Sequence, residues 1–159
     1  MVTRTDDLVV EPLRLGDVVA FAQCAAIDVT EFPHPSIPAL DETGAAPAIW
    51  VARGGRDGVV SGFIVAGRRR RVLEIHGLAV AAERRRRGVG RALLRAAIDR
   101  ARAWRCRAVV LQVSTANRAA LALYDGEGFV RMRRLHRYYA RWRFGDGGDA
   151  WAMLLPLAS

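Results

Sequence analysis

The sequence contains no lysine, so all 25 of its basic side chains are arginines, which a GC-rich coding bias explains. Cysteine and histidine are also scarce, with two and three residues. Cys24 and Cys106 have neither the paired spacing nor the neighbouring histidines of a metal site. We therefore expect two free buried thiols and no bound metal.

Long apolar runs are missing as well. No stretch reaches the roughly 18 apolar residues of a membrane-spanning helix, and the first residues lack a signal-peptide pattern. We therefore expect a cytoplasmic protein with no membrane partner. The 159 residues, 52% of them hydrophobic, predict a single domain with a substantial core.

Two nucleotide-binding motifs are incomplete around the glycine-containing segment Arg85-Arg86-Arg87-Gly88-Val89-Gly90. A third glycine would fall at Leu93, and residue 110 is valine rather than an acid, which excludes the dinucleotide-binding fingerprint. No Gly-Lys-Ser/Thr follows either, so the segment is not a P-loop.

The same segment still has the features of an anion site. It lies between an apolar strand pattern at residues 72–80 and a helix that begins near Val89, whose apolar residues recur at helical spacing. The first turn of such a helix offers unpaired N–H groups and the positive end of the helix dipole. Gly88 and Gly90 allow phosphate oxygens to approach, and the arginines add charge. The alternative is a solvated turn.

Charge is distributed unevenly along the chain. Residues 1–50 hold two arginines and eight acidic residues, whereas residues 51–159 hold 23 arginines and eight acidic residues. This asymmetry favours a basic half for an anionic cofactor and an acidic half that receives a cationic amine. Two solvated surfaces are the alternative.

The apolar periodicity predicts an α/β protein with a mixed sheet and helices on both faces. We expect a helix from the cap Asp17 to residue 26, a loop at 32–47 with a short helix at 39–43, and a helix at 118–124. Residues 54–58 predict a hairpin, and residues 68–71 a charged turn. The expected strands are 8–15, 49–52, 59–66, 72–80, 109–113 and 150–157, and segments 129–134 and 142–144 flank a tyrosine pair.

The second half of the chain makes a family resemblance specific. Arg-x-x-Gly-x-Gly is followed by Leu-x-Val-x-x-x-Asn-x-x-Ala-x-x-Leu-Tyr-x-x-x-Gly-Phe, which ends at Phe129. This pattern resembles the GNAT family of N-acetyltransferases, and most closely its bacterial branch that acts on the N-termini of ribosomal proteins. The likeness covers residues 59–157 and only loosely residues 1–58. It implies one domain over residues 1–159, with a mixed, mostly antiparallel central sheet.

The resemblance implies acetyl-CoA as cofactor. The backbone of Leu78, Ala79 and Val80 would bind the pantetheine arm as an added strand and polarise the thioester carbonyl. Asn117 would bind coenzyme A, although a helix N-cap alone also explains it. Tyr124, two helical turns further on, would line the same cofactor. The residues expected to hold the pyrophosphate are Arg85, Arg86, Arg87, Gly88, Val89, Gly90 and Arg91.

The resemblance also suggests catalytic roles. Tyr124 would be the general acid that protonates the leaving thiolate; core packing is the alternative. The ribosomal-protein acetyltransferases carry glutamate where this chain has Gln112, which cannot accept a proton, so Glu74 is the expected base, with His76 or a water as alternatives. The tentative acceptor-binding residues are Gln112, His76, Tyr138 and Tyr139, although the tyrosines also fit a stacked strand or hairpin.

We therefore expect an acetyltransferase in which a primary amine attacks the thioester directly. The acceptor of first choice is a protein or peptide N-terminus, and the second is a small-molecule amine. A different class is an arginine-rich nucleic-acid binder that uses residues 68–71 and 84–87. No nucleic-acid-binding motif is present, so we expect no specific nucleic-acid partner. Either a monomer or a homodimer is compatible with the sequence.

Overall fold

The computed structural model describes residues 3–5, 8–32, 47–54, 56–141 and 148–158. The chain divides into two compact units. The first unit comprises Met1–Gly67 and His76–Arg100, and the second comprises Arg68–Ile75 and Ala101–Ser159. Strand β5 (Val72–Val80) contributes residues to both units, which are described separately below.

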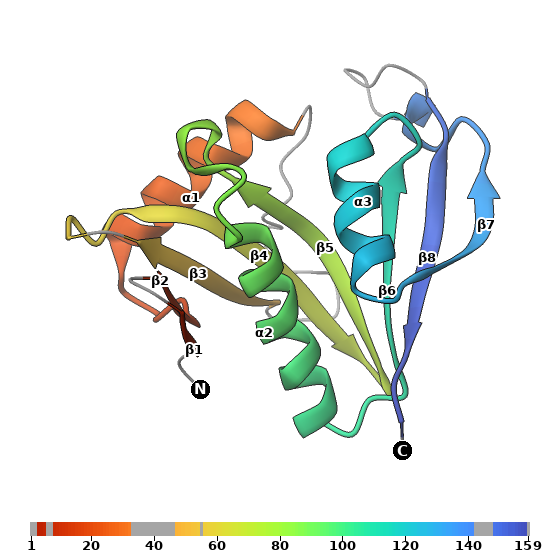
Figure 1. Cartoon of the computed structure of the whole chain (residues 1–159), viewed down its shortest axis with the longest axis horizontal. Coiled ribbons are helices and arrows are strands. Elements are labelled where there is room, and N and C mark those ends of the chain that lie inside the picture. Colours follow the sequence, from red (N-terminus) through yellow and green to blue (C-terminus); the bar gives the residue numbers. More distant parts are fainter. Residues whose placement is uncertain (1–2, 6–7, 33–46, 55, 142–147, 159) are drawn as a thin grey trace. The chain divides into compact units, whose positions relative to one another are not determined.

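The first unit is built on a sheet whose strands follow the order β1-β2-β3-β4-β5 (Figure 1). The pairs β1–β2, β2–β3 and β3–β4 are antiparallel. Two α-helices and a short 3-10 turn complete it. Besides β5, the elements are β1 (Thr3–Thr5), β2 (Leu8–Pro12), β3 (Ala48–Gly54), β4 (Val60–Arg69), α1 (Val18–Glu31), η1 (Ala82–Arg84) and α2 (Val89–Ala103), whose last residues belong to the second unit.

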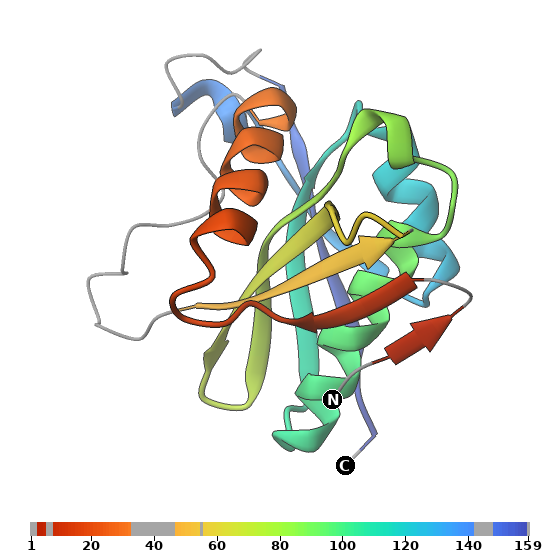
Figure 2. The ribbon, with the colours of Figure 1, turned by 90° about the vertical axis from the view of Figure 1, so that its left-hand side faces the viewer.

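Strand β4 is buried on both faces because a helix covers each of them. Phe63 and Val65 belong to the core cluster that includes the α1 residues Ala20, Cys24 and Ile27. Alternation turns Gly62 to the opposite face, where an added Cβ would lie 3.2 Å from Val89 and 3.3 Å from Leu93 of α2. Figure 2 shows α1 and α2 on opposite sides of these strands. The predicted helices on both faces are confirmed.

Helix α1 begins where the sequence predicts and ends later. The Asp17 carboxylate accepts a hydrogen bond from the N–H of Ala20 at 2.9 Å, which confirms the N-cap. The expected end at residue 26 is wrong, because Ile27 and Asp28 are buried and carry the helix on to Glu31. The first predicted strand, residues 8–15, is shorter than expected and stops at Pro12, and β1 was not predicted.

The second unit contains the strand order β5-β6-β8-β7. Strand β5 pairs with β6 in parallel, whereas β6–β8 and β7–β8 are antiparallel, so the sheet is mixed and mostly antiparallel, as predicted. The further elements are β6 (Ala108–Ser114), α3 (Arg118–Gly126), β7 (Val130–Leu135), η2 (Tyr138–Arg141) and β8 (Ala150–Pro156).

The other predicted elements have mixed outcomes. The strand at residues 72–80 matches β5 throughout, and the 54–58 hairpin joins β3 to β4. The charged turn at 68–71 is shorter than expected because β4 continues to Arg69. The tyrosine pair lies in a 3-10 turn rather than a strand. The short helix predicted at 39–43 and the segment at 142–144 lie outside the described residues, as does the predicted loop at 32–47 except for its two end residues.

Both cysteines are free and buried, as expected. In the described part of the chain, no helix has the length and apolar character needed to cross a bilayer. Among the same residues, no group of three or more His, Cys, Asp or Glu side chains is placed to hold a metal ion.

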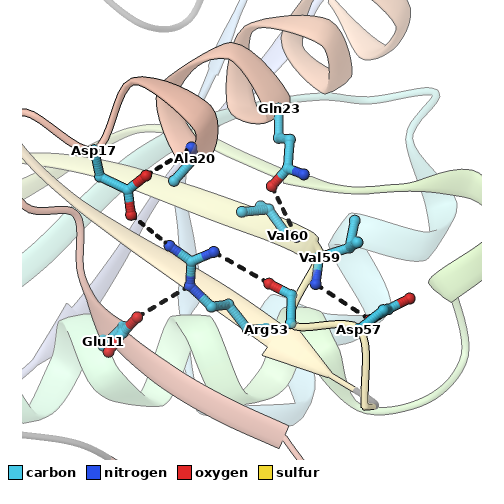
Figure 3. Close-up of polar contacts among 9 residues, drawn as sticks. Glu11, Asp17, Ala20, Gln23, Arg53, Asp57, Val59 and Val60 are labelled. Atoms are coloured by element: carbon cyan, nitrogen blue, oxygen red, sulfur yellow. Dashed lines mark hydrogen bonds and ion pairs between the residues drawn. The ribbon is translucent and has the colours of Figure 1, made fainter.

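A single arginine ties the start of α1 to the β2–β3–β4 strands. Arg53 donates from Nε to Glu11 at 3.0 Å and from Nη2 to Asp17 at 2.8 Å (Figure 3). It also donates to the carbonyl of Gly58 at 3.1 Å. Its side chain is only 23% exposed, so these bonds are partly shielded from water. Arg53 thereby holds the carboxylate that caps α1.

Replacing Arg53 should be costly for stability. Arg53→Met should lower the free energy of unfolding by about 2 kcal/mol, because Glu11 and Asp17 lose the cation they share. Arg56→Met is the matched control, since Arg56 is exposed on the neighbouring hairpin, and it should change stability by less than about 0.5 kcal/mol. Urea denaturation followed by circular dichroism gives both values. Equal losses in the two variants would contradict the role given to Arg53.

Candidate functional site

The arginine–glycine turn connects η1 to the first turn of α2. Arg86 and Gly88 both have positive φ, 60° and 77°, so the backbone enters the left-handed region twice before the helix begins. Gly88 tolerates this conformation because it has no Cβ. A Cβ added there would meet no atom within 4 Å, so the space beside the turn is open.

Helix α2 presents its N-terminus at this turn. Its first turn contains no acidic residue. The N–H groups of a first helical turn have no intrahelical acceptor, and the helix dipole adds partial positive charge there. The exposed side chains of Arg86 and Arg87 stand next to it, and no ion pair of either is described. The arrangement suits an anion with several oxygens, such as a diphosphate.

The two preceding arginines are engaged by acids, which the sequence analysis did not foresee. Arg84 donates to Asp57 at 3.2 Å. Arg85 forms an ion pair with Glu31 at the end of α1, and its Nε donates to the carbonyl of Val80 at 3.4 Å. The structure therefore brings the predicted residue Arg85 to the end of β5, next to Val80. An anion that binds Arg85 must share it with Glu31.

Acidic side chains of residues 1–50 do not form an open patch where the structure describes them. Glu11 and Asp17 pair with Arg53, and Glu31 pairs with Arg85. Asp28 is buried and also has a partner. These four residues therefore give no support to an amine-receiving acidic surface.

Strand β5 turns Glu74 away from the core. The described parallel ladder joins Val72, Leu73 and Glu74 to Ala108, Val109 and Val110. Leu73 and Ile75 are buried, whereas Glu74 is half-buried and His76 is exposed. Since Gln112 follows Val110 by two residues, Glu74 and Gln112 share one face of the second unit's sheet. The structure thus places the expected base, Glu74, on the same sheet face as Gln112, which stands where the ribosomal-protein acetyltransferases carry glutamate.

His76 has a different neighbour. A Cβ added at Gly67 of β4 would lie 2.9 Å from its Nε2, so the imidazole occupies the space that Gly67 leaves empty. The structure describes no further polar partner for His76.

Helix α3 carries two predicted site residues. Asn117 is its N-cap, since the side-chain oxygen accepts from the N–H of Ala120 at 3.1 Å. Tyr124 lies seven residues along the helix, 6% exposed, with its ring 5.6 Å from that of Phe129. Burial raises the pKa of the Tyr124 phenol, and Tyr139 raises this pKa further. Tyr124 therefore keeps its proton at neutral pH.

An acid that was not predicted as a site residue holds the turn directly before the tyrosine pair. The rings of Tyr138 and Tyr139 meet edge to face, with centroids 5.0 Å apart. Directly before them, the N–H of Arg137 donates to the Asp149 carboxylate at 2.8 Å, and Arg134 donates to it at 2.7 Å. These two bonds lower the pKa of Asp149 from 3.8 to about 2. In the sequence, Asp149 is distinguished by its position directly before the predicted last strand.

Comparison with known proteins identifies a family that the sequence matches. The sequence profile described as "Acetyltransferase (GNAT) family" matches residues 19–129. N-alpha-acetyltransferase 30 of Saccharomyces cerevisiae is 40% identical over 80 residues, which are 50% of this chain and 43% of that protein. N-alpha-acetyltransferase RimI of Mycobacterium tuberculosis is 42% identical over 80 residues, which are 50% of this chain and 46% of that protein.

The likeness to solved structures extends further along the chain. A chain in the crystal structure of the NatC complex bound to Gag peptide and CoA superimposes with a TM-score of 0.77 and 27% identity. That match covers 96% of this chain and 99% of the other. The matches to the two curated relatives, by contrast, span less than half of their lengths.

The Asp149 contacts predict a pH dependence of stability. Because its folded-state pKa is lowered, the stabilisation is complete above the ordinary value of 3.8 and disappears as the pH falls through about 2. Wild type should therefore be more stable than Asp149→Asn at neutral pH, and the difference should vanish toward pH 2. Urea unfolding of both proteins across this range measures it. A difference independent of pH would contradict the assignment.

Proposed function

Because the chain belongs to the GNAT acetyltransferase family, we propose that it transfers the acetyl group of acetyl-CoA to the α-amine at a protein or peptide N-terminus. The observation that carries the proposal is the open turn at Gly88, which leads into a helix N-terminus free of acidic residues and flanked by arginines. The N-alpha-acetyltransferase relatives support this choice of acceptor.

The cofactor-binding residues are proposed from the first unit and from α3. The backbone of Gly88, Val89 and Gly90 and the side chains of Arg86 and Arg87 would bind the diphosphate. Arg85 and Arg91 would add charge from either side of the turn. The peptide groups of Leu78, Ala79 and Val80 would align the pantetheine arm and the acetyl carbonyl. Asn117 would contribute its remaining polar atoms.

Acetyl-CoA supplies an activated thioester, and residues of the chain would donate and accept the protons that the transfer requires. The amine nitrogen forms a bond to the acetyl carbon while the carbon–sulfur bond breaks. Tyr124, which holds its proton at neutral pH, would donate it to the departing thiolate. Glu74 would accept the proton that the amine loses, through a water, while Gln112 on the same sheet face orients that water or the acceptor backbone.

The acceptor would lie against the tyrosine pair. Tyr138 and Tyr139 follow the segment that Asp149 holds, and Tyr139 adds to the rise in the pKa of Tyr124. An N-terminal peptide segment would contact these rings while its amine faces the thioester. A small-molecule amine is the competing acceptor. Only a peptide acceptor has residues after its N-terminal one that can contribute to recognition.

The direct test is a thiol-release assay with acetyl-CoA and a panel of amines. Peptides with free N-termini should be acetylated, whereas the same peptides with blocked N-termini, polyamines and aminoglycosides should not. Mass spectrometry of the product locates the acetyl group. Turnover confined to polyamines or aminoglycosides would replace the acceptor assignment, and no turnover with any amine would overturn the proposed activity.

The proton donor is tested within the same assay. Tyr124→Phe should lower kcat by roughly a hundredfold, because the leaving thiolate loses its acid. Acetyl-CoA affinity should be retained, since the ring still packs on Phe129. Calorimetry gives that affinity and thermal unfolding reports the fold. An unchanged kcat would remove the role of Tyr124.

The glycine turn offers a matched pair of variants. Gly58 and Gly88 both have positive φ, 63° and 77°, with open space around the missing Cβ. Gly58→Ala and Gly88→Ala should each lower the free energy of unfolding by about 1 kcal/mol. Only Gly88→Ala should weaken acetyl-CoA binding, by roughly tenfold, because it displaces the amides at the helix start. Equal affinities in the two variants, measured by calorimetry, would place the diphosphate elsewhere.

A further inference from the structure

Asp149 stands where three strands of the second unit reach the same end. Strand β8 begins at the next residue, Ala150, which is in register with Ser114, the last residue of β6. Ala150 is also in register with Leu135, the last residue of β7. Because β8 lies between β6 and β7, the residue that enters it is within reach of both segments that leave its neighbours.

On the β7 side, the carboxylate organises the turn before the tyrosines. One oxygen accepts from the Arg137 N–H at 2.8 Å and lies 3.2 Å from Nδ1 of His136. The other accepts from Nε of Arg134 at 2.7 Å. Arg137 has a positive φ of 49°, a conformation that a non-glycine residue keeps only when its surroundings hold it. The Asp149 side chain is 13% exposed, so it is mostly enclosed by these partners.

On the β6 side, the backbone of the same residue organises the entry to α3. The carbonyl of Asp149 accepts from the N–H of Thr115 at 3.0 Å. Two residues later, Asn117 donates from its N–H to the carbonyl of Ser114 and caps α3, which carries Tyr124. One residue therefore contacts both the turn that presents the tyrosine pair and the loop that begins the helix of the proposed acid.

We propose that Asp149 is a positioning residue that holds Tyr138 and Tyr139 in place for the acceptor peptide, relative to Tyr124 within the same unit. This inference rests on the proposed function, because it assigns the tyrosine pair to acceptor binding. The Asp149 side chain acts through the Arg134–Arg137 turn, whereas its carbonyl, which no side-chain substitution removes, keeps the entry to α3. Loss of the carboxylate should therefore disturb the acceptor side and spare the cofactor side.

The test compares Asp149→Ala and Asp149→Asn with Asp125→Asn as control. Asparagine can still accept from the Arg137 N–H but has no charge for Arg134 or His136. Asp125 is an exposed acid of the same unit whose one described ion pair, to Arg131 at 2.7 Å, lies outside the turn. Steady-state kinetics with an acceptor peptide and acetyl-CoA are combined with hydrogen exchange over residues 134–140.

We expect the Asp149 variants to change the KM for the peptide but not the affinity for acetyl-CoA. Asp149→Ala should raise the peptide KM by roughly tenfold, and Asp149→Asn by less, with acetyl-CoA affinity within about twofold of wild type. Hydrogen exchange at residues 137–139 should become faster in the same order, and Asp125→Asn should match wild type in every measurement.

Two results would overturn the inference. One is exchange and peptide KM in Asp149→Asn and Asp149→Ala equal to those of Asp125→Asn. The other is a loss of activity that only follows the folded fraction, with peptide KM and acetyl-CoA affinity affected alike. If wild type acetylates no peptide, the proposed function fails, and so does the link to the acceptor. Faster exchange in the variants would then still show that Asp149 holds the turn.

Discussion

Strand β5, nine residues long, pairs with β6 at its start and leads into the arginine–glycine turn at its end, so the proposed site depends on its register. Its first residues pair with β6, which sets Leu73 toward the core and Glu74 toward the opposite face. Its last residue, Val80, offers a carbonyl to Arg85. A slip by one residue would bury Glu74 and expose Leu73, a change that the apolar core opposes. The register of the strand therefore decides both which face Glu74 occupies and where the turn begins.

The turn after β5 has more positive charge than its ion pairs use. Arg84 and Arg85 are shared with Asp57 and Glu31, whose side chains are 50% and 25% exposed. Ion pairs of this kind contribute only about 0–1 kcal/mol, so a diphosphate can compete for Arg85 at little cost. Arg86 and Arg87 are exposed beside the helix N-terminus. The two acids therefore neutralise only part of the positive charge of the loop. This arrangement also weakens the case for a nucleic-acid surface, because two of the four arginines at 84–87 are already paired.

Local patterns predicted what depends on local physics. The alternation in β5, the Asp17 and Asn117 caps and the helix after Gly88 all follow from neighbours within a few residues. The Arg85–Glu31 and Arg84–Asp57 pairs join residues 54 and 27 positions apart, which no spacing rule reveals. A strand or hairpin with stacked aromatic and arginine side chains was the alternative to an acceptor-binding role for the tyrosine pair. A 3-10 turn forms instead, next to a turn whose backbone is held by Asp149, 12 residues from Arg137.

Gln112 stands where the ribosomal-protein acetyltransferases carry glutamate, and it cannot accept a proton. This difference favours an acceptor amine that loses its proton easily. An α-amine has a pKa of about 7.7–8.0, against about 10.4 for lysine, so its deprotonation costs about 3 kcal/mol less. The proposed base Glu74 is thus better matched to an α-amine than to a lysine side chain.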